Sequence, residues 1–278
     1  MLMYLLIVLA LPHPTAAKPH LRSESAIVRM ADTHEILLTK NPDAARPIAS
    51  VTKLMSGLLL SQHKNPTDAL ITITEDDKDH RKWSRSRLRV GWVFPWSKLL
   101  EAALGASDNR AMYAAVRGAG IPEAQFVAQM NAKAQTLGML HTQFVDPAGV
   151  DPGNLSTARD LLQLLDAAAG SSTVCANTLH ETIQLTCART KRSVRLTNPN
   201  RLARSAAWDV VVGKTGYTIE AGRALVTRVT LHGRPVDMIF LGAHEMASVF
   251  GDASRVRSWL TSHMPPRPTQ ISAATTVR

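Results

Sequence analysis

The spacing of apolar residues divides the chain into a strand-like beginning, a helical middle and a strand-like end. Residues 26–40 contain two short runs of strand type on either side of an Ala-Asp-Thr-His turn, which predicts a β-hairpin. Residues 71–74, Ile-Thr-Ile-Thr, predict one more short strand. Three further runs of strand type occupy residues 208–216, 223–232 and 234–243.

Helical spacing dominates between these strands. One helix is expected to begin at residue 49 or 50 and to run to residue 63, because Asn-Pro follows shortly afterwards. Residues 96–139 are rich in Ala, Leu, Met and Gln with two glycine-containing breaks, so two or three helices fit there. Ser156 is placed to cap another helix, and Asp252 is a candidate cap for a last one over residues 252–263.

Strands at both ends with helices between them favour the α+β class. The expected architecture is one central antiparallel sheet, built from the N- and C-terminal segments, with flanking helices and an inserted helical subdomain at about residues 75–175. A single catalytic domain is expected over residues 20–262. A site in such a fold would lie at the seam between the sheet and the helical subdomain. A residue such as Ser50, at the start of a central helix, would face that crevice.

The two ends of the chain differ from this domain. Residues 2–11 are apolar but fall short of the ~20 residues that cross a bilayer. A Pro-His-Pro break and the small residues Thr15-Ala16-Ala17 follow, so residues 1–17 are interpreted as a secretory signal, although no Lys or Arg precedes the apolar run. A buried first strand or helix is the alternative. Residues 263–278 are rich in Pro and Thr and are expected to be disordered.

The net charge of +10 widens the range of partners to consider. Nucleic acid, acidic membranes and anionic polymers all attract such a protein. The densest basic cluster, RKWSRSRLR at residues 81–89, is interpreted as a solvated loop. Because secretion argues against nucleic acid, no nucleic-acid partner is expected.

Cysteine and histidine usage gives no sign of a metal site. Cys175 and Cys187 could pair across a short loop in an oxidising compartment, and the sequence leaves that disulfide open. There is no Cys-x-x-Cys, and the ten histidines show no ligand spacing. We therefore expect neither a metal nor a cofactor.

The candidate chemistry begins with the pattern Ser-x-x-Lys, which occurs at Ser50/Lys53 and again at Ser61/Lys64. On a helix this spacing brings the hydroxyl and the amine to one face. Roughly one occurrence is expected by chance in a chain of this size, so the pattern alone decides nothing. Ser50 lies at a helix start, where free N–H groups favour negative charge, whereas Ser61 lies near the end.

Two later motifs select the first pair. Ser107-Asp108-Asn109 precedes a predicted helix, and Lys214-Thr215-Gly216 lies on a predicted strand. In this order, Ser-x-x-Lys, Ser-x-Asn and Lys-Thr-Gly form the signature of active-site serine penicillin-interacting enzymes.

The residue types suit acyl transfer. A serine hydroxyl is a weak nucleophile until a neighbour takes its proton, and Lys53 can do so only when neutral. Its pKa must therefore fall from about 10.4 towards about 7 to 8, through desolvation and a nearby Lys214. Ser107 can relay a proton towards the leaving amine, and Asn109 can hold a substrate amide. Lys214 and Thr215 suit a carboxylate beside the scissile bond.

The chain resembles the low-molecular-weight penicillin-binding proteins, the serine D-alanyl-D-alanine peptidases, and most closely their endopeptidase branch. The resemblance covers about residues 25–260 and is carried by RPIASVTKLMS, MNAKAQTLGM, FVDPAGVDPGNLSTARDLLQLL, GKTGYTIEAGRAL and FGDASRVRSWL. It implies that Ser50 is the nucleophile and Lys53 its base. It also implies that Ser107 and Asn109 form the second element of the site, and that Lys214, Thr215 and Gly216 form the third. The oxyanion donors would be the N–H groups of Ser50 and Tyr217.

The resemblance further implies a periplasmic enzyme that cleaves peptidoglycan stem peptides and is inhibited by β-lactams. Two residues depart from the family pattern, Pro199 in a loop and Ala224 where relatives often carry Cys. The chain ends soon after its last predicted helix, so we expect no C-terminal domain and no stable membrane anchor.

Three alternatives remain beside the endopeptidase. The first is a D-alanyl-D-alanine carboxypeptidase. The second is a class A-type β-lactamase, which needs a Glu-x-x-Leu-Asn loop, whereas QFVDPAGVDPGNLSTA contains no Glu. The third is a non-catalytic relative that binds peptidoglycan without cutting it.

Overall fold

The computed structural model describes residues 17–63, 69–245 and 247–263. The predicted signal segment 1–17 and tail 263–278 lie outside these ranges, except for Ala17 and His263. His263 is the last residue of helix α7 (Ser248–His263). Within the described ranges, no helix combines the length and apolar character that a bilayer crossing requires.

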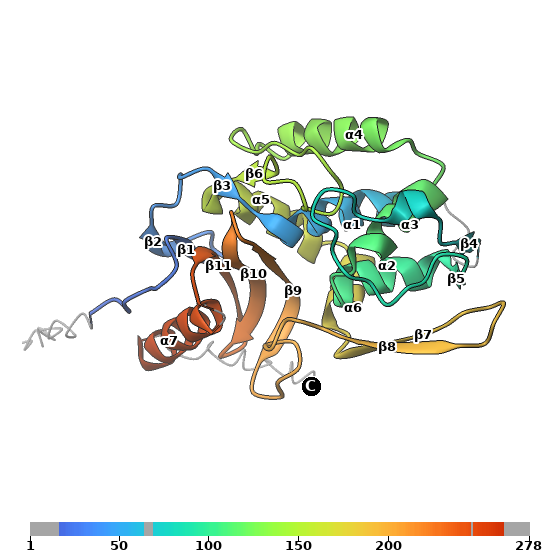
Figure 1. Cartoon of the computed structure of the whole chain (residues 1–278). Helices are drawn as coiled ribbons and strands as arrows, with labels where there is room; N and C mark the ends of the chain where they lie inside the picture. The colour runs from blue at the N-terminus through green and yellow to red at the C-terminus, as the bar shows by residue number, and fades with distance from the viewer. Residues whose placement is uncertain (1–16, 64–68, 246, 264–278) are drawn as a thin grey trace, which may run out of the picture.

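A five-stranded antiparallel sheet joins the two ends of the domain (Figure 1). Its order is β2-β1-β11-β10-β9, and β1 pairs with β11 from Ser25↔Leu241 to Met30↔Val236. The strands span Ser25–Met30 (β1), Ile36–Lys40 (β2), Asp209–Thr218 (β9), Gly222–Leu231 (β10) and Arg234–Ala243 (β11). The predicted hairpin and the three late strands are thus confirmed, and the expected α+β class is observed.

Helices lie on both faces of this sheet (Figure 1). Helix α7 covers one face, and the other helices form a larger body on the opposite face. That body contains a 3-10 turn η1 (Ala49–Thr52), α1 (Lys53–Gln62), α2 (Trp96–Gly105), α3 (Asn109–Gly118), α4 (Glu123–Thr136), α5 (Ala158–Ala169) and α6 (Ser172–Leu179). The Ala-rich middle of the chain therefore forms three helices between residues 96 and 136.

Short elements connect these layers. The two-stranded pairs are β3 (Arg46–Pro47) with β6 (Leu155–Ser156), β4 (Leu70–Thr72) with β5 (Val93–Pro95), and β7 (Thr182–Thr186) with β8 (Ser193–Thr197). A second 3-10 turn, η2, spans Glu75–Asp77. The β7–β8 hairpin extends away from the sheet below the helical body (Figure 1).

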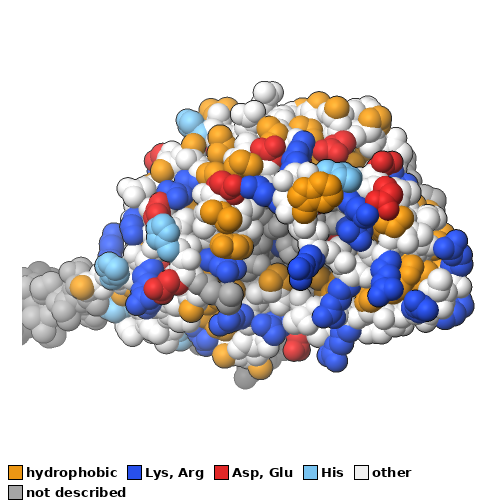
Figure 2. Space-filling view, in the orientation of Figure 1, with side chains coloured by type: hydrophobic (Ala, Val, Ile, Leu, Met, Phe, Trp, Pro, Cys, Tyr) orange, Lys and Arg blue, Asp and Glu red, His pale blue; other side chains and the backbone are white. Residues whose placement is uncertain are grey.

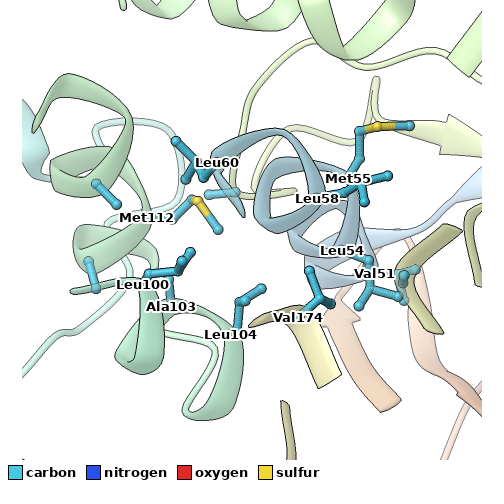
Figure 3. Close-up of a cluster of buried hydrophobic side chains, with 14 of the residues drawn as sticks. Val51, Leu54, Met55, Leu58, Leu60, Leu100, Ala103, Leu104, Met112 and Val174 are labelled. Carbon is cyan, nitrogen blue, oxygen red and sulfur yellow. The ribbon is translucent and has the colours of Figure 1, made fainter. Parts of the chain in front are cut away.

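Helix α1 runs through the centre of the larger hydrophobic core. Its residues 53 to 58 are all buried, and apolar side chains of α1, α2, α3 and α6 meet around it (Figure 3). Gly57 allows α2 to approach, since a Cβ there would lie 2.7 Å from Leu104 Cδ2. A helix packed on all sides has little freedom to move. The residues at its start are therefore held in fixed positions.

Both predicted helix caps are wrong. Thr157, not Ser156, caps α5, because its Oγ1 accepts a hydrogen bond from Asp160 N at 3.0 Å. Asp252 lies inside α7, and its buried carboxylate accepts hydrogen bonds from Ser23 N at 2.8 Å and Arg22 N at 2.9 Å. A buried carboxylate needs donors wherever the fold provides them. Here Arg22 and Ser23 supply them from the other end of the chain, and Arg255 adds one from α7 itself.

The two cysteines are free thiols. Cys175 Sγ donates to the carbonyl oxygens of Ala168 and Ala169, both at 3.5 Å, within the helical body. Cys187 Sγ instead accepts a hydrogen bond from Val93 N at 3.3 Å. The disulfide that the sequence left open is therefore not formed in this structure.

Candidate active site

The first element of the site is the turn that starts α1. Turn η1 carries Ser50, and Lys53 follows one turn later, so that Lys53 Nζ lies 2.9 Å from Ser50 Oγ. The Lys53 side chain is completely buried, whereas Ser50 is half-buried and faces a cavity. The hydroxyl is thus accessible while the amine beneath it is shielded from water.

Lys53 has two further partners. Its Nζ donates to Asn109 Oδ1 and to the carbonyl oxygen of Ala148, both at 2.6 Å. Burial lowers the pKa of Lys53 to about 8, and the carboxylates of Asp146 and Asp108 oppose that shift. A neutral amine has two N–H groups, for Asn109 and Ala148, and one lone pair, which can accept the Ser50 hydroxyl proton. The three contacts therefore suit the neutral, basic form.

The Ala148 carbonyl is held by a loop that sequence reasoning did not assign to the site. The carboxylate of Asp146 is buried and accepts hydrogen bonds from the N–H groups of Ala148 at 2.7 Å and Gly149 at 2.6 Å, and from Asn154 Nδ2 at 2.7 Å. Gly149 has φ +75°, and a Cβ there would lie 1.9 Å from the Ala49 carbonyl oxygen. The loop thus packs directly against η1. Its Asp-Pro-Ala-Gly sequence is a turn signal that could have predicted this shape.

The second element lies between α2 and α3. Ser107 adopts φ +61°, and Asp108 caps α3 by accepting a hydrogen bond from Ala111 N at 2.9 Å. Asn109 is the first residue of α3, so its side chain is fixed beside Lys53. Its Nδ2 donates to Ser84 Oγ at 2.8 Å, a contact that the sequence gave no reason to expect.

The third element is strand β9, which passes close to η1. Lys214 is only 2% exposed, and its Nζ donates to Ser107 Oγ at 2.8 Å. Burial and the positive charge of Lys53 lower the pKa of Lys214 well below its ordinary value. A Cβ at Gly216 would lie 2.8 Å from the Ile48 carbonyl oxygen and 3.2 Å from Ser50 N. Glycine at this position therefore permits the close approach of β9 to the serine.

A cavity of about 530 Å³ joins the three elements. The predicted residues that line it are Ser50, Ser107, Asn109, Thr215, Gly216 and Tyr217. Lys53 and Lys214 do not line the cavity but contact Ser50 and Ser107, which do. The structure thus brings together every residue that the sequence assigned to the site. Figure 2 shows a face of the molecule that is hollowed near its middle.

The rest of the cavity wall includes several basic and apolar side chains. Tyr217 is 51% exposed, and the Arg223 guanidinium lies 3.7 Å from its ring centroid. Arg201 and Arg204 also line the cavity, as do Pro199 and Ala224, the two residues that depart from the family pattern. Lys82 forms an ion pair with Glu220 in the β9–β10 turn. An anionic ligand would meet a positively charged wall here.

The second Ser-x-x-Lys pattern is not part of this cavity. Ser61 Oγ donates to the Leu58 carbonyl oxygen at 2.8 Å and accepts from Ser171 Oγ at 3.2 Å, at the other end of α1. Lys64 lies outside the described residues. In the described part of the chain, no three His, Cys, Asp or Glu side chains gather as metal ligands would.

Comparisons with known proteins agree on one family. The family model described as D-alanyl-D-alanine carboxypeptidase matches residues 13–245. The chain is 36% identical to a D-alanyl-D-alanine endopeptidase of Pseudomonas aeruginosa, over 90% of this chain and 82% of that protein. It is 32% identical to a D-alanyl-D-alanine endopeptidase of Escherichia coli, over 91% of this chain and 82% of that protein. The solved DD-transpeptidase of Streptomyces K15 has a TM-score of 0.78 and 26% identity, covering 87% of this chain and 98% of that one.

Proposed function

We propose that this chain, which belongs to the D-alanyl-D-alanine carboxypeptidase family of serine peptidases, is an endopeptidase that cuts D-alanyl cross-links between peptidoglycan stem peptides. Ser50 is the nucleophile in this proposal. The observation that carries it is the 2.9 Å contact between the cavity-facing Ser50 Oγ and the buried Lys53 Nζ. The relatives named endopeptidases, which match most of the chain, support the substrate.

The first chemical step is acylation. Neutral Lys53 accepts the Ser50 hydroxyl proton as Oγ forms a bond to the carbonyl carbon of D-alanine. The oxyanion that develops would accept hydrogen bonds from the N–H groups of Ser50 and Tyr217. A Cβ at Gly216, the residue before Tyr217, would lie 3.2 Å from Ser50 N, which supports this assignment. Donors fixed in advance need no reorganisation as charge appears, so they stabilise the transition state more than the substrate.

Collapse of this intermediate breaks the D-alanyl amide bond. The leaving nitrogen takes up a proton from Ser107, which is replaced in turn by the proton that Lys53 accepted from Ser50, so that Lys53 is neutral again. Ser107 Oγ lies 2.8 Å from Lys214 Nζ. The carboxylate next to the scissile bond interacts with Lys214 and Thr215, and the acyl-side amide with Asn109. A water molecule then attacks the Ser50 ester and gives a proton to neutral Lys53, and that proton returns to Ser50 Oγ as the peptide acid leaves. No redox step or cofactor enters this sequence.

β-Lactams are expected to acylate Ser50 by the same route, because their strained amide offers the same carbonyl to the serine. The predicted signal at residues 1–17 supports export, and the relatives are bacterial enzymes, so we place the reaction in the periplasm. The basic cavity wall suits an anionic, carboxylate-bearing polymer.

The decisive experiment compares two substrates. Purified cross-linked muropeptide dimers and uncross-linked pentapeptide monomers are digested side by side, and the products are separated by chromatography. We expect dimers to disappear and monomers to accumulate. Release of free D-alanine without loss of dimers would instead assign the protein to the carboxypeptidases, which the matching family model names.

A further inference from the structure

The cavity continues into two grooves along the β7–β8 hairpin. The first, of about 350 Å³, shares Ala106, Ser107 and Asn109 with the cavity. The second, of about 560 Å³, shares Arg87 with the first. The three hollows therefore lie next to one another, in a row that starts at Ser50.

Arginines line this path on both sides. One wall is the loop between η2 and β5, and the other is the β7–β8 hairpin. The arginines are Arg85, Arg87 and Arg89 from the loop, and Arg192 and Arg195 from the hairpin. In Figure 2, Lys and Arg side chains gather over the part of this face where Figure 1 places the hairpin.

The loop presents its arginines by alternation. Arg85, Arg87 and Arg89 are exposed, while Ser86 is half-buried and Leu88 is fully buried. Leu88 is buried between two exposed residues, so it fixes the segment against the core while Arg87 and Arg89 reach solvent. The cluster that the sequence marked as a solvated loop is thus an ordered wall of the groove.

These arginines have no carboxylate partner within the described residues. Asp108 lines the first groove, but its oxygens accept hydrogen bonds from Ala111 N and from Ser86 Oγ at 2.8 Å. Arg87 Nη1 donates to the Arg195 carbonyl oxygen at 3.0 Å, and the Arg89 guanidinium lies 5.9 Å from the Trp92 ring centroid. Like charges that line one groove repel one another, and a bound anion removes that cost.

We infer that this groove binds the second stem peptide of a cross-linked substrate through its carboxylates. The inference rests on the proposed function. A cross-linked dimer is longer than the single stem that the cavity accepts, so its second arm must extend beyond the cavity, and the neighbouring groove shares the wall residues Ala106, Ser107 and Asn109 with it. Guanidinium groups match carboxylates in geometry and bind them bidentately. The groove thereby favours cross-linked over uncross-linked peptides.

The test measures binding without catalysis. Two Ser50→Ala proteins are compared, one of them also carrying Arg87→Gln and Arg195→Gln, and the Kd of each is measured for a purified muropeptide dimer and for a pentapeptide monomer. We expect the groove substitutions to raise the dimer Kd about 10- to 100-fold and the monomer Kd by about twofold at most. A matched control, Lys133→Gln/Arg257→Gln, removes the same charge elsewhere and should leave both values unchanged.

Several outcomes would overturn the groove assignment. One is a dimer Kd that is the same with and without the groove arginines. Another is a dimer Kd that rises as much in the charge-matched control as in the groove variant. A third is that the groove substitutions weaken binding of a short oligonucleotide, measured in the same way, and leave the dimer Kd unchanged. That result would identify the groove as a nucleic-acid surface. Digestion of dimers by the wild-type protein is a separate readout, so failure of the proposed function is distinguishable from failure of the groove. Melting curves of all variants verify that they are folded.

Discussion

Lys53 Nζ lies 2.9 Å from Ser50 Oγ, and the Lys53 side chain is completely buried while the serine faces the cavity. This pairing of an accessible hydroxyl with a shielded amine distinguishes Ser50 from Ser61, whose hydroxyl contacts the Leu58 carbonyl and Ser171. Burial lowers the pKa of the amine to about 8, so a fraction of it is neutral at physiological pH, and the contact lets its lone pair face Ser50, the proposed nucleophile.

The pH dependence of acylation should follow Lys53. Burial lowers its pKa to about 8, so the fraction of neutral, basic amine grows as the pH rises through that value. We expect the second-order rate of acylation by a fluorescent penicillin to rise from pH 6 and to level off above about pH 9. Stopped-flow or quenched labelling across this range measures it. A rate that is flat across this range would contradict Lys53 as the base.

Asp146 should set the position of that profile. Its negative charge raises the pKa of Lys53, so Asp146→Asn should lower the pKa of Lys53 and move the rising limb of the rate to lower pH. The substitution also replaces an acceptor of several backbone N–H bonds, which should reduce the free energy of unfolding by about 2–4 kcal/mol. Denaturation curves and acylation profiles test the two effects separately. A purely structural role would lower stability and leave the profile unmoved.

Gly216→Ala should abolish acylation. Its Cβ would lie 2.8 Å from the Ile48 carbonyl oxygen, which would force β9 away from Ser50 and separate the N–H groups of Ser50 and Tyr217, the proposed oxyanion donors. Loss of one such donor costs about 10²- to 10³-fold in rate. Gly170→Ala is the control, because its Cβ would come no closer than 3.5 Å to any neighbour. Normal penicillin labelling of Gly216→Ala would show that the close approach is not needed.

Removal of the Lys214 amine should weaken recognition of the substrate carboxylate. Lys214→Met keeps the length of the buried side chain but loses the 2.8 Å contact with Ser107 Oγ and the charge that faces a substrate carboxylate. We expect kcat/KM for muropeptide dimers to fall about 100-fold or more, by loss of a charge-assisted contact and of the proton relay. For a dimer whose carboxylate beside the scissile bond is amidated, the substitution should lower kcat/KM much less. Equal losses for both substrates would contradict carboxylate recognition by Lys214.

Local spacing predicted the elements and which of them carries each motif, whereas the expectation that the three motifs meet in one site came from their resemblance to the penicillin-interacting enzymes. Ser50 and Lys53 are neighbours on one turn, and Lys214 to Gly216 follow one strand. Contacts between distant segments were not predictable in this way. Ala148 contacts Lys53, and Ser84 contacts Asn109, only after loops far apart in sequence pack together.

The mistaken caps have the same cause. Asp252 has the side chain of a cap, but its carboxylate is used by Ser23 and Arg22, which precede the first strand. The basic cluster at residues 81–89 likewise lines a groove only because the β7–β8 hairpin, distant in sequence, supplies the other wall. Sequence patterns report which residues can bind, whereas packing decides what each of them meets.

The most direct test of the account is the intact mass of the protein after incubation with benzylpenicillin. We predict that the wild-type protein and Ser61→Ala each gain the mass of one penicillin, and that Ser50→Ala gains none. Peptide mapping of the adduct should place it on Ser50. Labelling of Ser50→Ala, or loss of labelling in Ser61→Ala, would contradict the assignment of Ser50 as the nucleophile.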